Sequence, residues 1–185
     1  MQSSRNGVDV QSESFLALLA QQDQVRANRV PGVRTVLVVL SSRGIVFDME
    51  SLKQKILLAY PEAAVFFRTT SGKPVGVATP RRVDLLIDFT SPGSRQGLFY
   101  ARKLRSLARL AVGRHAGFFR KKIYDRTIDE KGAALKLLPQ DALERERVVQ
   151  RQVLEAAGIA LAPMGDLPAD RGQTIALELP AMKRL

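Results

Sequence analysis

Two adjoining stretches decide the fold class: Arg34-Thr-Val-Leu-Val-Val-Leu-Ser-Ser-Arg-Gly44 and Ile45-Val-Phe-Asp-Met-Glu-Ser-Leu-Lys-Gln-Lys-Ile-Leu-Leu-Ala-Tyr-Pro61. The first is an apolar run, rich in β-branched residues, that ends in a Ser-Ser-x-Gly turn. The second carries Leu52, Ile56 and Ala59 at helical spacing and stops at a proline. Strand, turn and helix in this order make a βα unit of a doubly wound sheet, in which ligands bind at the carboxyl ends of the strands.

Further apolar runs and helical patterns follow the first unit in alternation. Near-continuous apolar runs predict buried parallel strands. We expect strands over 63–68, 83–90, 109–113 and 124–129, helices over 95–107 and 141–157, an irregular loop over 69–82 and a basic loop or single turn over 117–122. Strands that alternate with helices predict an α/β fold: one Rossmann-like domain with a mainly parallel sheet. A helix over 14–28 precedes it.

The expected organisation has four parts: a disordered tail (1–13), the N-terminal helix with its linker (14–33), the Rossmann-like domain (34–158) and a tail or linker-like segment (159–185). The N-terminal helix carries an apolar stripe that includes Leu19 and Val25. Because its polar face is rich in glutamine rather than lysine, docking on protein is favoured over docking on a membrane.

Bulk composition excludes several classes of protein. A length of 185 residues suits one domain with a small appendage. No apolar run is long enough for a transmembrane helix, and the first ten residues lack the features of a secretory signal, so we expect a cytoplasmic location. With no cysteine and a single histidine, His115, thiolate catalysis and Cys- or His-rich metal sites are excluded. No metal or cofactor is predicted.

The positive charge is concentrated in one segment. The chain carries a net charge of +11, and ten basic residues lie between Arg95 and Arg126 against a single acid, Asp125. Such clustering favours a polyanionic partner: a nucleic acid, anionic lipid headgroups or a phosphorylated glycan. The alternative is the solvated face of a basic protein.

Taken in order, these segments resemble the N-terminal, acceptor-side half of the ADP-heptose:lipopolysaccharide heptosyltransferases and their GT-B relatives. Residues 36–44 resemble the first strand of the family and its Ser-Ser-x-Gly turn, and 52–61 resemble its first helix. Val83-Asp-Leu-Leu-Ile-Asp88 is similar to the Tyr-Asp-Leu-Val-Ile-Asp strand of the family, and Ala108-Arg-Leu-Ala-Val-Gly113 to its Ala-x-x-Arg-Ile-Gly strand. Residues 145–158 resemble the helix before the interdomain linker. The resemblance implies half of a GT-B fold and a role in lipopolysaccharide biosynthesis.

Three departures from the family bear on catalysis. The acidic residue that follows the turn glycine in the family, where it is proposed to act as general base, is Ile45 here. Asp48 could replace it only if the turn were re-routed. Residues 69–82 are short where the family has a further strand and helix, and the chain stops before the domain that binds the nucleotide sugar. We therefore expect a domain that is non-catalytic alone, or that needs a second glycosyltransferase chain as donor-domain partner.

The expected ligand is an anionic glycolipid or glycan at the inner face of the cytoplasmic membrane. The turn at the end of the first strand can present backbone N–H groups to an anion, although ordinary loop chemistry is the alternative. Spacings of 7, 10 and 14 residues predict that four arginines share one helical face, with three more cations beside it. The candidate ligand-binding residues are Ser41, Ser42, Arg43, Gly44, Arg95, Arg102, Arg105, Arg109, Arg120, Lys121 and Lys122.

Two other interpretations remain open. Phe118, Phe119 and Tyr124 interleave with the basic residues and could stack the bases of a single-stranded nucleic acid, although no RNA-binding signature occurs. A binding protein for nucleic acid or the ribosome is therefore the second candidate. For His115 and Asp88 a structural role is favoured, but Asp88 lies near the carboxyl end of a strand, where it could face a ligand crevice lined by 41–48 and 88–95.

Overall fold

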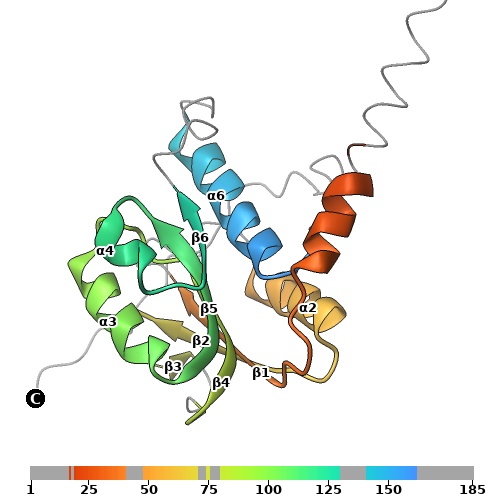
Figure 1. The fold of residues 1–185 in the computed structure, drawn as a ribbon, viewed down its shortest axis with the longest axis horizontal. Helices are drawn as coiled ribbons and strands as arrows, with labels where there is room; N and C mark the ends of the chain where they lie inside the picture. Colours follow the sequence, from red (N-terminus) through yellow and green to blue (C-terminus); the bar gives the residue numbers. More distant parts are fainter. Residues whose placement is uncertain are drawn as a thin grey trace, which may run out of the picture.

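The structure, a computed structural model, describes residues 17, 19–40, 48–70, 80–129 and 141–161, and the backbone of 74–75. After an N-terminal helix, whose described part runs over 19–27, the chain alternates between strands and helices. The elements are β1 (Thr35–Leu40), α2 (Met49–Ala59), β2 (Ala64–Thr69), β3 (Pro74–Val75), β4 (Val83–Asp88), α3 (Arg95–Arg105), β5 (Ala108–His115), α4 (Phe118–Lys121), β6 (Arg126–Asp129) and α6 (Ala142–Ala156). Figure 1 shows them as three layers, with the sheet between two layers of helices.

The sheet has the order β3-β2-β1-β4-β5-β6, and every pair except β2–β3 is parallel. The predicted α/β fold with a mainly parallel sheet is confirmed. From β1 the chain builds the sheet first toward β2 and then toward β4 and beyond. The gap between the carboxyl ends of β1 and β4 is therefore the topological switch point, where ligands of such folds bind. The two strand ends are tied by Phe89 N, which donates to Val39 O at 3.0 Å.

Both faces of the central strands are buried, as their near-continuous apolar sequence requires. Alternate residues of each strand point to opposite faces, so β1 contributes to two cores. Val36, Val38, Leu52, Ile56, Val153 and Leu154 belong to the core under α2 and α6. Leu37, Val39, Leu86, Ala101, Leu104 and Tyr124 belong to the core under α3. The basic segment lies over this second core, with α3 and α4 (green in Figure 1) on the same side of the sheet.

Polar caps begin each of the longer helices. Asp48 caps α2 through Ser51 N, Ser94 caps α3 through Gly97 N, and Asp141 caps α6 through Leu143 N. At the other end of α6, Gly158 has a φ of 77°, the left-handed conformation in which a glycine ends a helix. The predicted helix over 141–157 is confirmed, with Asp141 and Ala157 as its two cap residues.

The structure corrects two sequence-based boundaries. α3 ends at Arg105, two residues before the predicted end, and β5 already begins at Ala108. The segment predicted as irregular, 69–82, contains a two-residue strand, β3, that pairs antiparallel with β2. Pairing of so short a strand depends on its neighbour rather than on its own pattern, so periodicity gives no sign of it.

The N-terminal helix docks on α6, in line with its glutamine-rich polar face. Val25 is buried, Gln21 Nε2 donates to Glu155 Oε1 at 3.0 Å, and Asn28 Nδ2 donates to the backbone oxygen of Glu155 at 3.1 Å. Burial between the two helices raises the pKa of Glu155. Figure 1 shows the helix (red) beside α6. Among the residues that the structure describes, no helix has the length and apolar character needed to cross a bilayer.

Candidate functional site

The carboxyl edge of the sheet is built from the end of β4, the loop 89–94 and the first turn of α3. The predicted turn residues Ser41, Ser42, Arg43 and Gly44, together with Ile45, lie outside the described residues. Asp48 is described, and its carboxylate accepts a hydrogen bond of 2.8 Å from Ser51 N. That bond makes Asp48 the cap of α2. A catalytic role for Asp48 stays a prediction.

A buried polar network lies under this edge, centred on Asp88. Asp88 is only 1% exposed, and its carboxylate accepts from Thr90 N at 2.7 Å and from Tyr124 Oη at 2.5 Å. The Arg120 guanidinium lies 3.7 Å from Asp88 Oδ2 and also donates to Tyr124 Oη at 3.3 Å. Burial and the neighbouring Asp88 carboxylate raise the pKa of Tyr124, so the phenol stays protonated and acts as the donor.

Arg120 lies inside the protein, which corrects its predicted position on a ligand-binding surface. It is 4% exposed, and its two terminal nitrogens donate to Thr90 Oγ1 and to Ser91 O. A buried cation needs a nearby anion and a full set of acceptors, and Asp88 with the loop 89–94 supplies both. Arg120 therefore fixes α4 to the switch-point loop and presents no charge to solvent.

A second arginine extends the network to the opposite layer of helices. Arg114, on β5, is buried; its Nε donates to Thr90 O at 3.1 Å and its Nη1 to Glu146 Oε2 at 2.8 Å. Glu146 Oε1 in turn accepts from the buried Gln150 of α6. The switch-point loop is thus held from both sides of the sheet, by α4 and by α6.

Two more of the predicted ligand-binding residues, Arg109 and Arg105, form hydrogen bonds within the protein. Arg109 lies in β5, because α3 has already ended, and its Nη2 donates to Pro31 O at 2.6 Å. The expected single face with Arg95, Arg102 and Arg105 is therefore wrong for Arg109. Arg105 is half-buried: it donates to Ala108 O and forms an ion pair of 2.8 Å with Asp125.

Apart from Arg109 on β5, five cations of this segment are exposed, and all five lie on α3, on α4 or directly after α4. They are Arg95, Arg102, Lys103, Lys121 and Lys122. Within the described part of the chain, none of the five forms a hydrogen bond or ion pair with another side chain. The single acid of the segment, Asp125, already pairs with Arg105.

Two of the exposed cations, Arg102 and Lys122, meet at a shallow pocket between α3 and α4. Its volume is about 280 Å³, and its lining consists of Arg102, Arg105, Phe119, Lys122 and Ile123. The structure thus brings together three of the predicted binding residues, from two different elements. Arg95 lies two turns before Arg102 on α3, at the carboxyl edge of the sheet.

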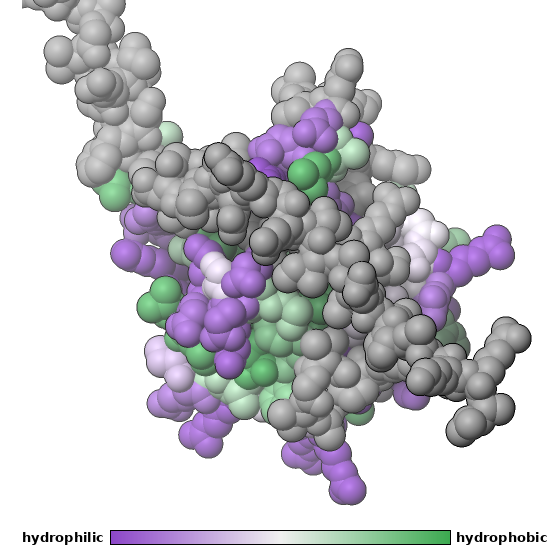
Figure 2. Space-filling model, turned by 180° about the vertical axis from the view of Figure 1, so that it is seen from behind, coloured by the Kyte–Doolittle hydropathy of each residue, from purple (hydrophilic) through white to green (hydrophobic). Residues whose placement is uncertain are grey.

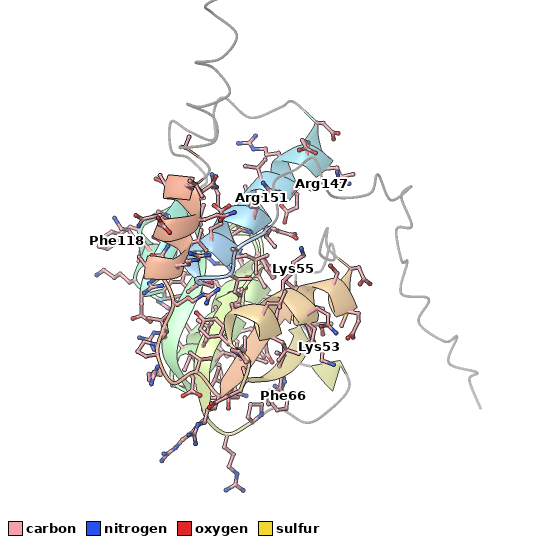
Figure 3. All side chains as sticks on the ribbon, turned by 90° about the vertical axis from the view of Figure 1, so that its right-hand side faces the viewer. Lys53, Lys55, Phe66, Phe118, Arg147 and Arg151 are labelled. Carbon is pink, nitrogen blue, oxygen red and sulfur yellow. The ribbon has the colours of Figure 1, made fainter. Side chains whose placement is uncertain are left out.

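Aromatic side chains accompany the cations. Phe118 is 65% exposed and Phe119 73%, with their rings edge to face at 6.3 Å, and Lys122 Nζ lies 4.3 Å from the centre of the Phe118 ring. Phe99, 75% exposed, lies one turn before Arg102 and Lys103 on α3. In Figure 3, Phe118 lies at the left-hand margin, away from Lys53 and Lys55 on α2 and from Arg147 and Arg151 on α6. We call the exposed cations and these three phenylalanines the α3–α4 surface.

Outside the α3–α4 surface, the described residues also include exposed leucines on other helices. Leu58 lies on α2 and Leu143 on α6. The side of the molecule turned away from the viewer in Figure 1 is mixed, with hydrophobic residues gathered at its centre and hydrophilic ones at the margin (Figure 2).

His115 ends β5 as a nearly buried side chain, not as an exposed one. Its Nδ1 lies 4.0 Å from Asp129 Oδ1 and makes no hydrogen bond with the described residues. In the described residues no three His, Asp or Glu side chains come together as a metal site would require.

Comparisons with known proteins give no further identification. No family model matches the chain, and the comparisons found no match among curated proteins or solved structures. Its class is therefore defined by its own topology, that of a Rossmann-like α/β domain.

Sequence reasoning missed the buried network. The sequence favours a structural role for Asp88 but names no partner for it, and it presents Tyr124 only as an aromatic side chain among basic residues. A partial signal existed, because Asp88 and Thr90 are polar residues at the end of a strand that is otherwise apolar. The identity of their partners depends on the course of the chain after β5, which no local pattern reveals.

Proposed function

We propose that this domain binds the phosphorylated headgroup of a glycolipid on the α3–α4 surface, as the acceptor-side domain of a glycosyltransferase of the lipopolysaccharide type. The observation that carries the proposal is the pocket where Arg102, Arg105 and Lys122 converge beside Phe119. The order of strands and helices that resembles the heptosyltransferases supplies the enzyme class.

The chemistry of the pocket suits a phosphorylated sugar. Arg102 and Lys122 are exposed and form no ion pair with the residues that the structure describes, whereas Arg105 is held in place by Asp125. An arginine fork binds phosphate with two hydrogen bonds, and a lysine adds a compact charge. The exposed Phe119 ring offers an apolar surface on which one face of a sugar ring can pack.

Transfer chemistry would need more than the described residues provide. Asp48 already caps α2, and Ile45 cannot accept a proton. We propose that this domain alone transfers no sugar and that a second chain with a donor domain supplies the nucleotide sugar, at the inner, cytoplasmic face of the membrane. Turnover of a nucleotide sugar by the purified 185-residue protein would overturn this part of the proposal.

The proposal is tested with the headgroup alone, free of lipid. Calorimetric titration of the protein with a phosphorylated core oligosaccharide should show binding that weakens with salt, and no binding after dephosphorylation. Arg102→Ala and Lys122→Ala should each lower affinity about tenfold, since each removes a charge-assisted contact. Lys55→Ala, which removes a cation from α2 in the opposite layer, is the matched control and should have no effect. Equal binding of the dephosphorylated oligosaccharide would refute the proposal.

A second function, binding of single-stranded nucleic acid, is favoured by one observation: the exposed Phe118 and Phe119 lie directly beside Lys121 and Lys122. Bases stack on aromatic rings while cations neutralise the phosphates. In that case a single-stranded oligonucleotide should bind and Phe119→Ala should weaken it by about tenfold or more.

A further inference from the structure

We infer that α4 docks this domain on an anionic phospholipid bilayer, with Phe118 and Phe119 in the interface and Lys121 and Lys122 among the headgroups. The inference deepens the proposed function, because it names the surface on which the domain would meet a glycolipid. It does not need the glycan: the contact is with the phospholipids themselves.

The two rings are presented outward on a firm base. α4 is a single turn of four residues, too short to be stable alone. It is held by the buried guanidinium of Arg120, by the buried Ile123 that follows it, and by Lys121 N, which donates to Gly117 O. Phe118 and Phe119 nevertheless stay 65% and 73% exposed. Two neighbouring phenyl rings that a fixed turn holds in water form an exposed hydrophobic patch, which is typical of an interaction site.

The surrounding charge selects the partner. Lys121, the last residue of α4, and Lys122, directly after it, follow the two phenylalanines, and Arg102 and Lys103 continue the positive surface on α3. The only carboxylate of this segment, Asp125, is neutralised by Arg105. Aromatic residues bordered by lysine and arginine fit the bilayer interface, where rings sit at headgroup level and flexible cationic side chains reach the phosphates. An anionic leaflet adds an attraction for each cation near its surface.

The arrangement of the rings separates a bilayer from a nucleic acid. Adjacent bases that remain stacked on each other present parallel faces, and two rings at a steep angle cannot both stack on them. The Phe118 and Phe119 rings lie at 72° to each other, and Lys122 lies over one face of the Phe118 ring. Insertion into a fluid interface has no such requirement of parallel rings.

The absence of tryptophan from the chain provides a direct test. A Phe119→Trp variant would carry one fluorophore at the proposed contact, and Leu58→Trp, at a 77% exposed position on α2, would carry it on the opposite layer. On adding vesicles that contain phosphatidylglycerol, fluorescence of Phe119→Trp should shift to the blue. Leu58→Trp should not shift, and neither variant should respond to vesicles of phosphatidylcholine alone. A shift at Leu58→Trp equal to that at Phe119→Trp would overturn the inference.

Co-sedimentation of the full chain with the same vesicles gives the energetic test. The double substitution Phe118→Ser with Phe119→Ser should lower binding about tenfold. The pair Lys121→Gln with Lys122→Gln should lower it by about fivefold for each lysine. The matched controls are Leu58→Ser and the pair Lys53→Gln with Lys55→Gln, all on α2, and they should bind like the parent. Circular dichroism would confirm that each variant is folded.

The outcomes separate this inference from the proposed function. If the parent protein binds the lipid-free headgroup but does not bind the anionic vesicles, the inference alone is overturned. Vesicle binding without headgroup binding would overturn the proposed function alone. If single-stranded RNA binds through Phe118 and Phe119 while vesicles do not, the surface serves a nucleic acid and the inference is wrong.

Discussion

Replacing Tyr124 with phenylalanine removes one oxygen atom from the centre of the buried network and leaves the ring in its place. The ring packs against Gly113, in the core under α3. Its hydroxyl donates to the Asp88 carboxylate at 2.5 Å and accepts from Arg120 Nε at 3.3 Å. The substitution therefore tests the polar contacts of Tyr124 apart from its apolar contacts.

The size of the expected loss of stability follows from the charge of the hydrogen-bond partner, the Asp88 carboxylate. A hydrogen bond to a charged group contributes about 1.5–3 kcal/mol to stability, against about 0.5–1.5 kcal/mol for a neutral one. Asp88 keeps its bond from Thr90 N and its contact with Arg120, so the carboxylate is not left bare. We expect Tyr124→Phe to lower the free energy of unfolding by about 2 kcal/mol.

Tyr60 provides the matched control for the assay. Its hydroxyl also bonds inside the protein, to Ala157 O at 2.6 Å and from Val30 N at 3.3 Å, but both partners are neutral. Tyr60→Phe should cost about 1 kcal/mol. Urea unfolding at pH 7, followed by circular dichroism, would give both values with an unchanged slope. A cost for Tyr124→Phe no greater than that for Tyr60→Phe would refute the assignment of Asp88 as a buried, charged acceptor.

Three further outcomes are expected. Burial raises the pKa of Tyr124, so the unfolded chain ionises this phenol near pH 10 while the folded chain keeps it protonated. The stability advantage of the parent over Tyr124→Phe should therefore shrink by about 1.4 kcal/mol for each pH unit above 10. Urea unfolding at a series of pH values would measure this change. A constant advantage up to pH 11 would contradict the burial of the phenol. Gly113→Ala would place a Cβ 2.6 Å from the Tyr124 ring and should cost about 1–3 kcal/mol in the same assay; an unchanged midpoint would mean that the two do not pack. Asp48→Ala should cost about 1 kcal/mol by removing the cap of α2, and Asp48→Ser should restore it; equal losses would argue against the capping role.

The fold was predictable where local pattern and tertiary burial agree. β1, Thr35–Leu40, lies within the apolar run that predicts the first strand, because an uninterrupted apolar run has no stable place other than the centre of the sheet. The end of α6 was predictable because Gly158 and the apolar stripe mark the same position. The end of α3 was not predictable, because Leu107 continues the helical spacing of apolar residues. In the structure Leu107 lies beyond the end of α3, directly before β5, and is 37% exposed.

The candidate site was predictable as a region but not residue by residue. The clustering of basic residues indicated α3 and α4 correctly, since net charge is visible in composition alone. The direction in which each side chain points was not visible. Arg120 and Lys121 are neighbours in sequence, yet one lies in the buried network and the other faces solvent. Consecutive residues of a helix point about 100° apart, so in a single turn this angle separates the buried Arg120 from the exposed Lys121. The rotation of α4 about its axis depends on its contact with the loop 89–94, which the local sequence does not reveal.

The basic segment therefore serves two separate purposes, and its charge at the surface is smaller than a count of residues suggests. Arg105, Arg114 and Arg120 each pair with a carboxylate, and Arg109 and Arg126 donate to backbone oxygens. Removing a buried partner such as Arg120 would leave Asp88 unpaired, with a cost of about 3–5 kcal/mol, so loss of binding in an Arg120 variant would report unfolding rather than a ligand contact. Arg102, Lys121 and Lys122 have no such structural role among the described residues, and a loss of binding in variants of these three would report on the surface itself.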